Sequence, residues 1–68
     1  MKNSHPGEFI QAEVMEPLSL VIEDAARRFG VPVDLLVAVL EGHAPIPQAL
    51  ADGLERAGFS TARFWMAL

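Results

Sequence analysis

The sequence predicts an all-α domain of five short helices, and three observations lead to that prediction. Apolar residues recur at helical spacing, as Ile22, Ala25, Ala26 and Phe29 do at i, i+3, i+4 and i+7. Proline or glycine separates such segments along the chain. No segment shows the apolar–polar alternation of a convincing strand. With 68 residues, the chain has room for one small domain.

The first helix is expected over residues 6–16, after a polar tail of residues 1–5 that we expect to be mobile. Pro6 suits the first turn of a helix, because the backbone N–H that proline lacks has no partner there. Ile10 and Val14 lie four residues apart and therefore fall on one face.

The second and third helices are separated by a glycine. The apolar stripe of the second helix ends at Phe29, and Gly30 follows as the expected left-handed cap. At its start Ser19 is the expected cap, since Val21 has no side-chain acceptor. The third helix is expected over residues 33–41, closed by Gly42. Its expected core-facing residues are Leu36, Val39 and Leu40.

The last two helices are expected over residues 47–57 and from Ser60, which we expect to cap the final one. Gly53 should weaken the fourth helix by about 1 kcal/mol relative to alanine. Phe64 and Trp65 of the fifth helix are expected in the core. The apolar residues of the fourth helix are Leu50, Ala51 and Leu54.

Composition and charge narrow the classes of function. Five basic residues against nine acidic ones give a net charge of −4, which disfavours nucleic acid as a partner. The chain has no cysteine and no serine with His and Asp at catalytic spacing, so we expect no catalytic residue, metal, cofactor or small-molecule substrate. Without a secretion signal or a membrane-spanning stretch of about 20 apolar residues, a cytoplasmic protein without membrane contact is expected.

The middle of the chain carries a helix-turn-helix pattern over about residues 21–41. Ala26 stands four residues before the turn glycine, Gly30, and the apolar Leu36 stands six residues after it. This spacing is typical of two helices that cross closely with a small side chain at their nearest approach.

The residues on either side resemble the HigA-type antitoxins, small helix-turn-helix proteins of the Xre/lambda-repressor-like superfamily. The segments that carry the resemblance are HPGEFI at 5–10, EPL at 16–18, ARRFGV at 26–31, Gly42, Ile46 and FW at 64–65. It extends over residues 5–68 and implies that residues 6–68 form one lambda-repressor-like, DNA-binding domain, usually dimeric. Members repress their own operon and neutralise an mRNA-cleaving toxin of the HigB type.

The recognition helix departs from the pattern that the resemblance implies, because family members carry polar and basic side chains there. The residues expected to face DNA or a partner are Pro32, Val33, Asp34, Val37, Ala38, Glu41 and His43. The outward helix residues among them donate no hydrogen bond to a phosphate, and the two acids would repel one. His43 stands where the family has Lys or Arg. Arg27 and Arg28 are candidate phosphate contacts, and compensation of the helix dipole is the alternative explanation for them.

Two functions follow. The first is a regulator that acts chiefly by protein contact, as a homodimer and with a HigB-type toxin or another protein, because a helix that is apolar nearly all round must be covered. The alternative is an ordinary operator-binding repressor that uses Arg27 and Arg28, although operator DNA is disfavoured. The alternative explanation for Val33, Leu35 and Val37 is that they are additional core residues. Burial of Val33, Val37 and Ala38 inside the monomer would contradict the first hypothesis.

Overall fold

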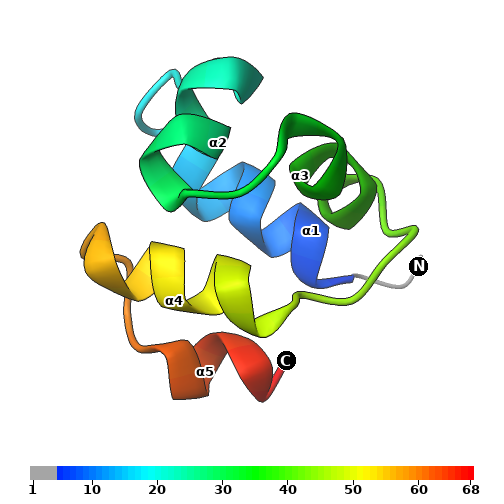
Figure 1. Ribbon diagram of the computed structural model, residues 1–68, viewed down its shortest axis with the longest axis vertical. Helices are drawn as coiled ribbons and strands as arrows, with labels where there is room; N and C mark the ends of the chain where they lie inside the picture. Colours follow the sequence, from blue (N-terminus) through cyan, green and yellow to red (C-terminus); the bar gives the residue numbers. More distant parts are fainter. Residues whose placement is uncertain (1–4) are drawn as a thin grey trace.

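The computed structural model describes residues 5–68, and all regular secondary structure in that part is helical (Figure 1). The elements are α1 (Pro6–Ile10), the π-helical segment η1 (Gln11–Met15), α2 (Ile22–Phe29), α3 (Val33–Leu40), α4 (Gln48–Arg56) and α5 (Ala62–Met66). Because η1 continues α1 as a single rod, residues 5–68 form five helices, and the predicted all-α class is confirmed. Of the expected tail, residues 1–4 lie outside the described residues, whereas His5 is half-buried and immediately precedes α1.

One apolar core holds the helices together, and every helix contributes to it. Its largest fully buried side chains are Phe29, Ile10, Leu36, Leu50, Leu54, Val14 and Val39. Each such side chain contributes about 1.5–3 kcal/mol through removal from water. The helical periodicity had assigned these residues to the inner faces, and that prediction is confirmed. Leu40, also expected to face inward, is half-buried and packs against the edge of the core.

Four of the helical segments end in the same way, with a residue in the left-handed conformation. These residues are Ser19, Gly30, Gly42 and Gly58, with φ of 52°, 72°, 79° and 93°. In each case the next residue donates its backbone N–H to the carbonyl five residues back, over 2.8–3.0 Å, as in a Schellman motif. The predicted caps at Gly30 and Gly42 are confirmed. The prediction for Ser19 is wrong: this residue ends the first helix instead of capping the second.

The cap of the last helix lies one residue after its predicted position. Ser60 has φ of 70° and precedes the cap. Thr61 is the cap, and its hydroxyl oxygen accepts a hydrogen bond from the backbone N–H of Phe64 at 3.1 Å. Glu55 of α4 accepts a second one from the N–H of Ala62 at 2.9 Å, which ties α5 to α4.

Two glycines allow helices to pack backbone against backbone. A Cβ atom on Gly7 would meet the carbonyl oxygen of Val39 and lie 2.7 Å from Cα of Leu40, where α1 crosses α3. A Cβ atom on Gly53 would meet the carbonyl oxygen of Phe29, where α4 crosses the end of α2. The sequence had suggested only that Gly53 weakens its helix. In the structure this glycine allows the close contact between α2 and α4.

The π-helical turn was not predicted. The backbone N–H of Glu16 donates to the carbonyl of Gln11 at 2.9 Å, five residues back, instead of four as in an α-helix. Within this segment the neighbouring residues Val14 and Met15 are both buried. The wider turn thus ends with two buried side chains, and the exposed Glu16 separates it from Pro17.

Candidate interaction surface on α2 and α3

The pair formed by α2 and α3 is built around a short turn. The helices pack on each other and are joined by residues 30–32 (Figure 1). Ala26 and Leu36 are both buried, and the N–H of Val31 donates to the carbonyl of Ala26 at 3.0 Å. Gly30 supplies the left-handed conformation that reverses the chain. The residues that the sequence pattern singled out therefore lie on the packed side of this pair.

The opposite side of α3 carries the residues predicted to face DNA or a partner. We call Val33, Asp34, Val37, Ala38 and Glu41 the α3 face. Asp34 and Glu41 are exposed, Val33 is 38% exposed, and Val37 and Ala38 are half-buried. None of the three apolar side chains belongs to the buried core of residues 5–68. The structure therefore does not bury these three side chains inside the monomer, and the hypothesis of protein contact is not contradicted.

Two further predicted residues border the α3 face. Pro32, immediately before α3, is exposed. His43 lies beyond the end of α3 with 74% of its side chain exposed, and its Nδ1 is 3.6 Å from a carboxylate oxygen of Glu41. Both are accessible, so the predicted surface extends along the outer side of α3 and beyond both of its ends.

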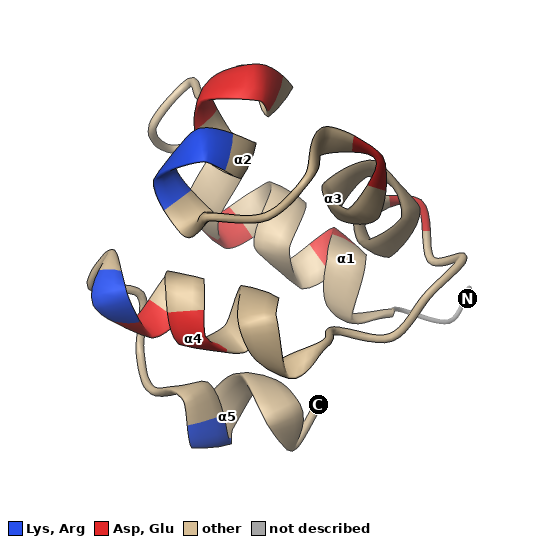
Figure 2. Cartoon of the chain, in the orientation of Figure 1, with Lys and Arg blue, Asp and Glu red and all other residues tan. Residues whose placement is uncertain are grey.

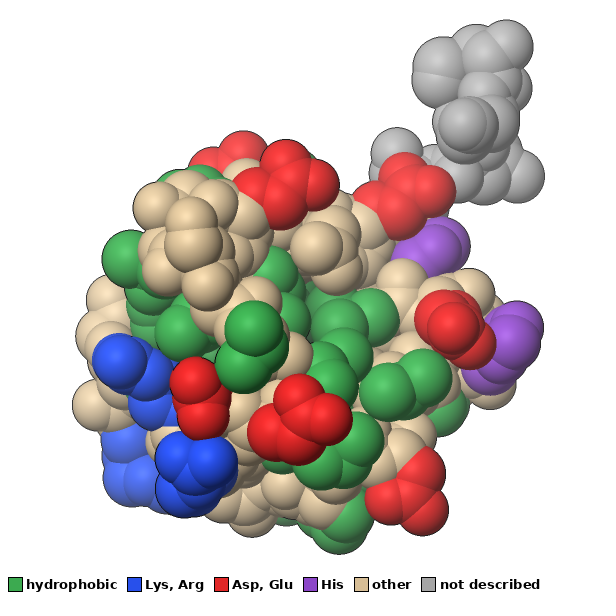
Figure 3. Space-filling view, turned by 90° about the horizontal axis from the view of Figure 1, so that it is seen from above, with side chains coloured by type: hydrophobic (Ala, Val, Ile, Leu, Met, Phe, Trp, Pro, Cys, Tyr) green, Lys and Arg blue, Asp and Glu red, His purple; other side chains and the backbone are tan. Residues whose placement is uncertain are grey.

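Charge is divided unevenly over this side of the molecule. Seen from above α2 and α3, hydrophobic side chains lie among Asp and Glu side chains, and Lys or Arg side chains gather at one corner (Figure 3). The ribbon shows the same division, with basic residues in the last turn of α2 and in α4 and α5, and only acidic ones on α3 (Figure 2). The surface is therefore apolar with an acidic border.

The basic corner contains both arginines that the sequence singled out, and a third that it did not. The guanidinium of Arg27 pairs with Asp24 at 3.0 Å, whereas Arg28 makes no ion pair with any residue in 5–68. A guanidinium nitrogen of Arg56 lies 3.2 Å from the position that a Cβ on Gly30 would occupy. Sequence reasoning missed Arg56 because only the packing of α4 against α2 brings it to this end of α2.

A second apolar surface lies at the other end of the molecule, around α5. Phe9 of α1 and Phe64 of α5 have ring centroids 5.9 Å apart, and the ring of Trp65 lies 5.1–5.6 Å from both. Trp65 is buried as predicted and donates its indole N–H to the carbonyl of Phe59. Phe64 was also expected in the core, and that expectation is wrong: it is 38% exposed. The turn of α5 that buries the indole directs the neighbouring ring outward.

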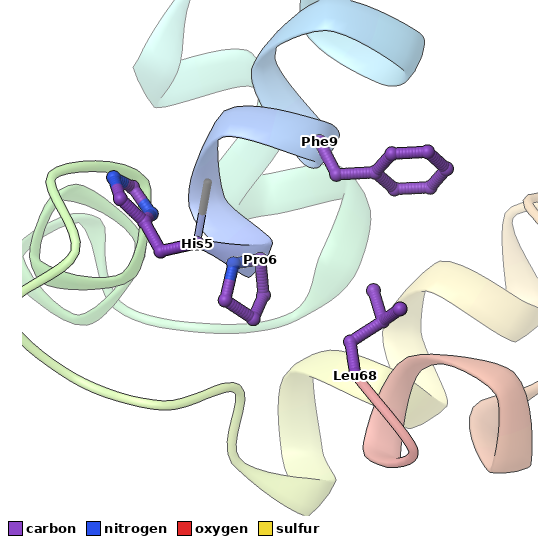
Figure 4. A pocket seen from close by; sticks show the side chains of 4 residues that line it. All are labelled: His5, Pro6, Phe9 and Leu68. Atoms are coloured by element: carbon purple, nitrogen blue, oxygen red, sulfur yellow. The ribbon is translucent and has the colours of Figure 1, made fainter. Parts of the chain in front are cut away.

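A shallow cavity of about 220 Å³ adjoins these rings (Figure 4). It is lined by His5, Pro6, Phe9 and Leu68, so the start of α1 and the end of the described chain meet there. His5 packs against Gly42, and its Nε2 lies 3.9 Å from the Glu8 carboxylate, while its Nδ1 is buried without a hydrogen-bond partner among the described residues.

Residues 5–68 contain neither a cluster of metal ligands nor a helix that could span a membrane. No three His, Asp or Glu side chains in this range lie close enough together to hold a metal ion. No helix of the described chain combines the length and the apolar character needed to cross a membrane.

The fold resembles that of an experimentally determined structure. The crystal structure of a hypothetical protein from E. coli superimposes with a TM-score of 0.86 over 98% of this chain and 68% of the other, at 27% sequence identity. No protein-family model and no curated protein matched the sequence. Since the similar protein is described only as hypothetical, the comparison shows the fold and assigns no activity.

Proposed function

We propose that this chain is a non-catalytic helix-turn-helix regulator, related in architecture to the HigA-type antitoxins, that acts chiefly by contact with other proteins. The observation that carries the proposal is the chemistry of the α3 face. In a helix-turn-helix protein the second helix reads the DNA, and here that helix would be α3. The three-residue turn, the left-handed Gly30 and the buried Ala26 and Leu36 support this assignment.

The α3 face lacks the groups with which proteins read DNA. Base edges in the major groove are read mainly by Arg, Lys, Asn and Gln, and phosphates are held by cations and hydrogen-bond donors. The α3 face has three apolar side chains and two carboxylates, Asp34 and Glu41. A protein surface with an apolar centre and basic edges fits it better, since complementary charges at the rim steer association. A HigB-type toxin, which the family resemblance implies, is the partner we propose.

An operator-binding repressor is the second candidate, and the basic corner favours it. Arg27, Arg28 and Arg56 lie at the end of α2, from which they could hold phosphates on either side of a groove. Asp24 already neutralises Arg27 in part. This function would require α3 to enter the groove with its two carboxylates toward the DNA, at a cost in repulsion.

Binding to the DNA upstream of the chain's own operon separates the two functions. Fluorescence anisotropy is measured with a labelled duplex over a series of salt concentrations. If the chain acts by protein contact, it should not bind this duplex even at low salt. An affinity that falls steeply with salt would show that phosphates are being neutralised, and it would favour the repressor.

Binding to a protein partner is tested with the purified product of the adjacent reading frame, which is titrated with this chain in a calorimeter. Val37→Glu should weaken binding by at least about 30-fold, as expected for a central contact. Ala49→Glu introduces the same charge on an exposed position of α4 and should have no effect. If Val37→Glu instead unfolds the domain, as circular dichroism would show, Val37 belongs to the core and the α3 face is not a docking surface.

A further inference from the structure

The charges of the α3 face have a definite order along the helix. Asp34 lies in the first turn of α3 and Glu41 directly after its last residue, with Val37 and Ala38 between them. Seven residues are almost two complete helical turns, so both carboxylates leave α3 on the same side, about 10 Å apart along its axis. From one end to the other, the α3 face therefore has an acidic group, an apolar surface and a second acidic group.

No Lys or Arg of the described chain pairs with these two carboxylates. Asp34 takes part in no ion pair with another residue in 5–68, and Glu41 has only the exposed imidazole of His43 near it, at 3.6 Å. The sequence between Arg28 and Arg56 contains no Lys or Arg. Both carboxylates are therefore available to the cations of a partner.

The packing of α3 fixes the spacing of the two acidic residues. On the opposite side of the helix, Leu36 and Val39 are fully buried in the core. At its end, the N–H of His43 donates to the carbonyl of Ala38 over 2.8 Å and closes the last turn. A helix held in this way has its outward residues in place before a partner binds, which lowers the entropy lost on binding.

The surface that complements the α3 face has cations on either side of an apolar or aromatic centre. Proteins that bind single-stranded nucleic acid have such surfaces, because their basic side chains follow the phosphates and their aromatic side chains stack on the bases. Against a surface of this kind, the two carboxylates would meet the cations that otherwise hold phosphates. Val37 and Ala38 would cover the stacking side chains between those cations.

We infer that the α3 face covers the single-strand-binding surface of its protein partner and excludes RNA from it. This inference rests on the proposed function, because it takes contact through α3 as given and adds which surface of the partner is covered. Asp34 and Glu41 occupy the places of two phosphates, and the chain itself needs no affinity for nucleic acid. Its net charge of −4 agrees with that role.

A competition experiment tests the inference. The purified product of the adjacent reading frame is bound to a fluorescein-labelled single-stranded RNA of about 12 nucleotides, and fluorescence anisotropy is followed as the chain is added. The anisotropy should fall to that of free RNA at about one equivalent of the chain. Asp34→Lys and Glu41→Lys should each raise the dissociation constant for the partner about tenfold, because each replaces an attraction by a repulsion. Asp52→Lys makes the same change of net charge on α4 and should have no effect.

The two α3 variants also distinguish a lost contact from a weakened fold. Lysine should lower the melting temperature in the first turn of a helix and raise it at the end, so equal losses of RNA release cannot arise from stability. RNA release that neither variant weakens would overturn the inference.

Calorimetry of the same mixture separates this inference from the proposed function. If the chain binds the partner while the RNA stays bound, the α3 face covers another surface; the inference is then wrong and the proposed function stands. A partner that binds the chain but has no affinity for the RNA leads to the same conclusion. If the chain does not bind the partner at all, both are wrong.

Discussion

Replacing Gly53 with alanine tests how closely α2 and α4 approach each other. On an exposed helix this change stabilises a protein by about 1 kcal/mol, because alanine has the higher helix propensity. Here the new methyl group would meet the carbonyl oxygen of Phe29 and lie 2.8 Å from its carbonyl carbon. Carbon atoms in contact rest about 3.5–4.0 Å apart. The atoms it meets are backbone atoms and cannot rotate away, so α4 must recede by about 1 Å.

The loss of stability expected for Gly53→Ala depends on the buried side chains that move with α4. A gap of about 1 Å forfeits up to half of the dispersion attraction across a contact. Overpacked cores lose about 1–3 kcal/mol, and the upper value applies here because Leu50, Ala51 and Leu54 of the same helix are all fully buried. After subtraction of the gain of about 1 kcal/mol in helix propensity, the net loss is about 2 kcal/mol. For a domain of this size the melting temperature should fall by about 8–16 °C.

The measurement is thermal and urea unfolding followed by circular dichroism. Ala49→Gly, on the exposed side of α4, serves as the control and should cost about 1 kcal/mol through helix propensity alone. Stabilisation by Gly53→Ala would refute the reasoning, because it would mean that α4 has open space where the structure places the backbone of Phe29.

Four other substitutions, at three helix ends, should change stability in directions that the caps determine. Thr61→Ala removes the acceptor for the N–H of Phe64 and should cost about 1 kcal/mol in urea unfolding, whereas Thr61→Ser should restore most of it. Ser19→Gly should stabilise the chain by about 1 kcal/mol, because serine at φ of 52° bears a steric cost that glycine avoids; a lower melting temperature would contradict this. Gly42→Ala should lower the free energy of unfolding by more than the roughly 1–2 kcal/mol that alanine costs in the left-handed conformation. The additional loss arises because its methyl group would also lie 2.8 Å from the His5 ring. If calorimetry shows no loss of stability, that contact is excluded.

The helices and the core were predictable because they depend on local spacing. Apolar residues at intervals of three and four placed Ile10, Val14 and Leu36 on inner faces, and all three are fully buried. Glycine after a helix predicted the caps at Gly30 and Gly42, because few other residues adopt positive φ at low cost.

The hydroxyl residues near helix ends were misassigned for a related reason. Serine and threonine can serve at either end of a helix, so composition alone does not decide which end they occupy. Ser19 closes the first helix, and Ser60 takes positive φ while the adjacent Thr61 makes the cap. The φ angle at each position determines which end of a helix the residue occupies, and this angle depends on the direction in which the next helix packs.

The surfaces required tertiary structure. The exposure of Phe64 beside the buried Trp65 depends on how α5 lies against α1, and the position of Arg56 near Gly30 depends on how α4 lies against α2. The α3 face was the exception, since its outward residues followed from helical periodicity once Leu36 and Val39 were assigned to the core.

At Gly7 the main chain of α1 rests directly on the main chain of α3. The tilt and depth of α3 are thereby set by atoms that every amino acid has in common, with no side chain acting as a spacer. Outward positions such as Val33 and Asp34 can then exchange one chemistry for another without shifting the helix that displays them. A scaffold of this kind can change its choice of partner through a few surface substitutions and keep its shape.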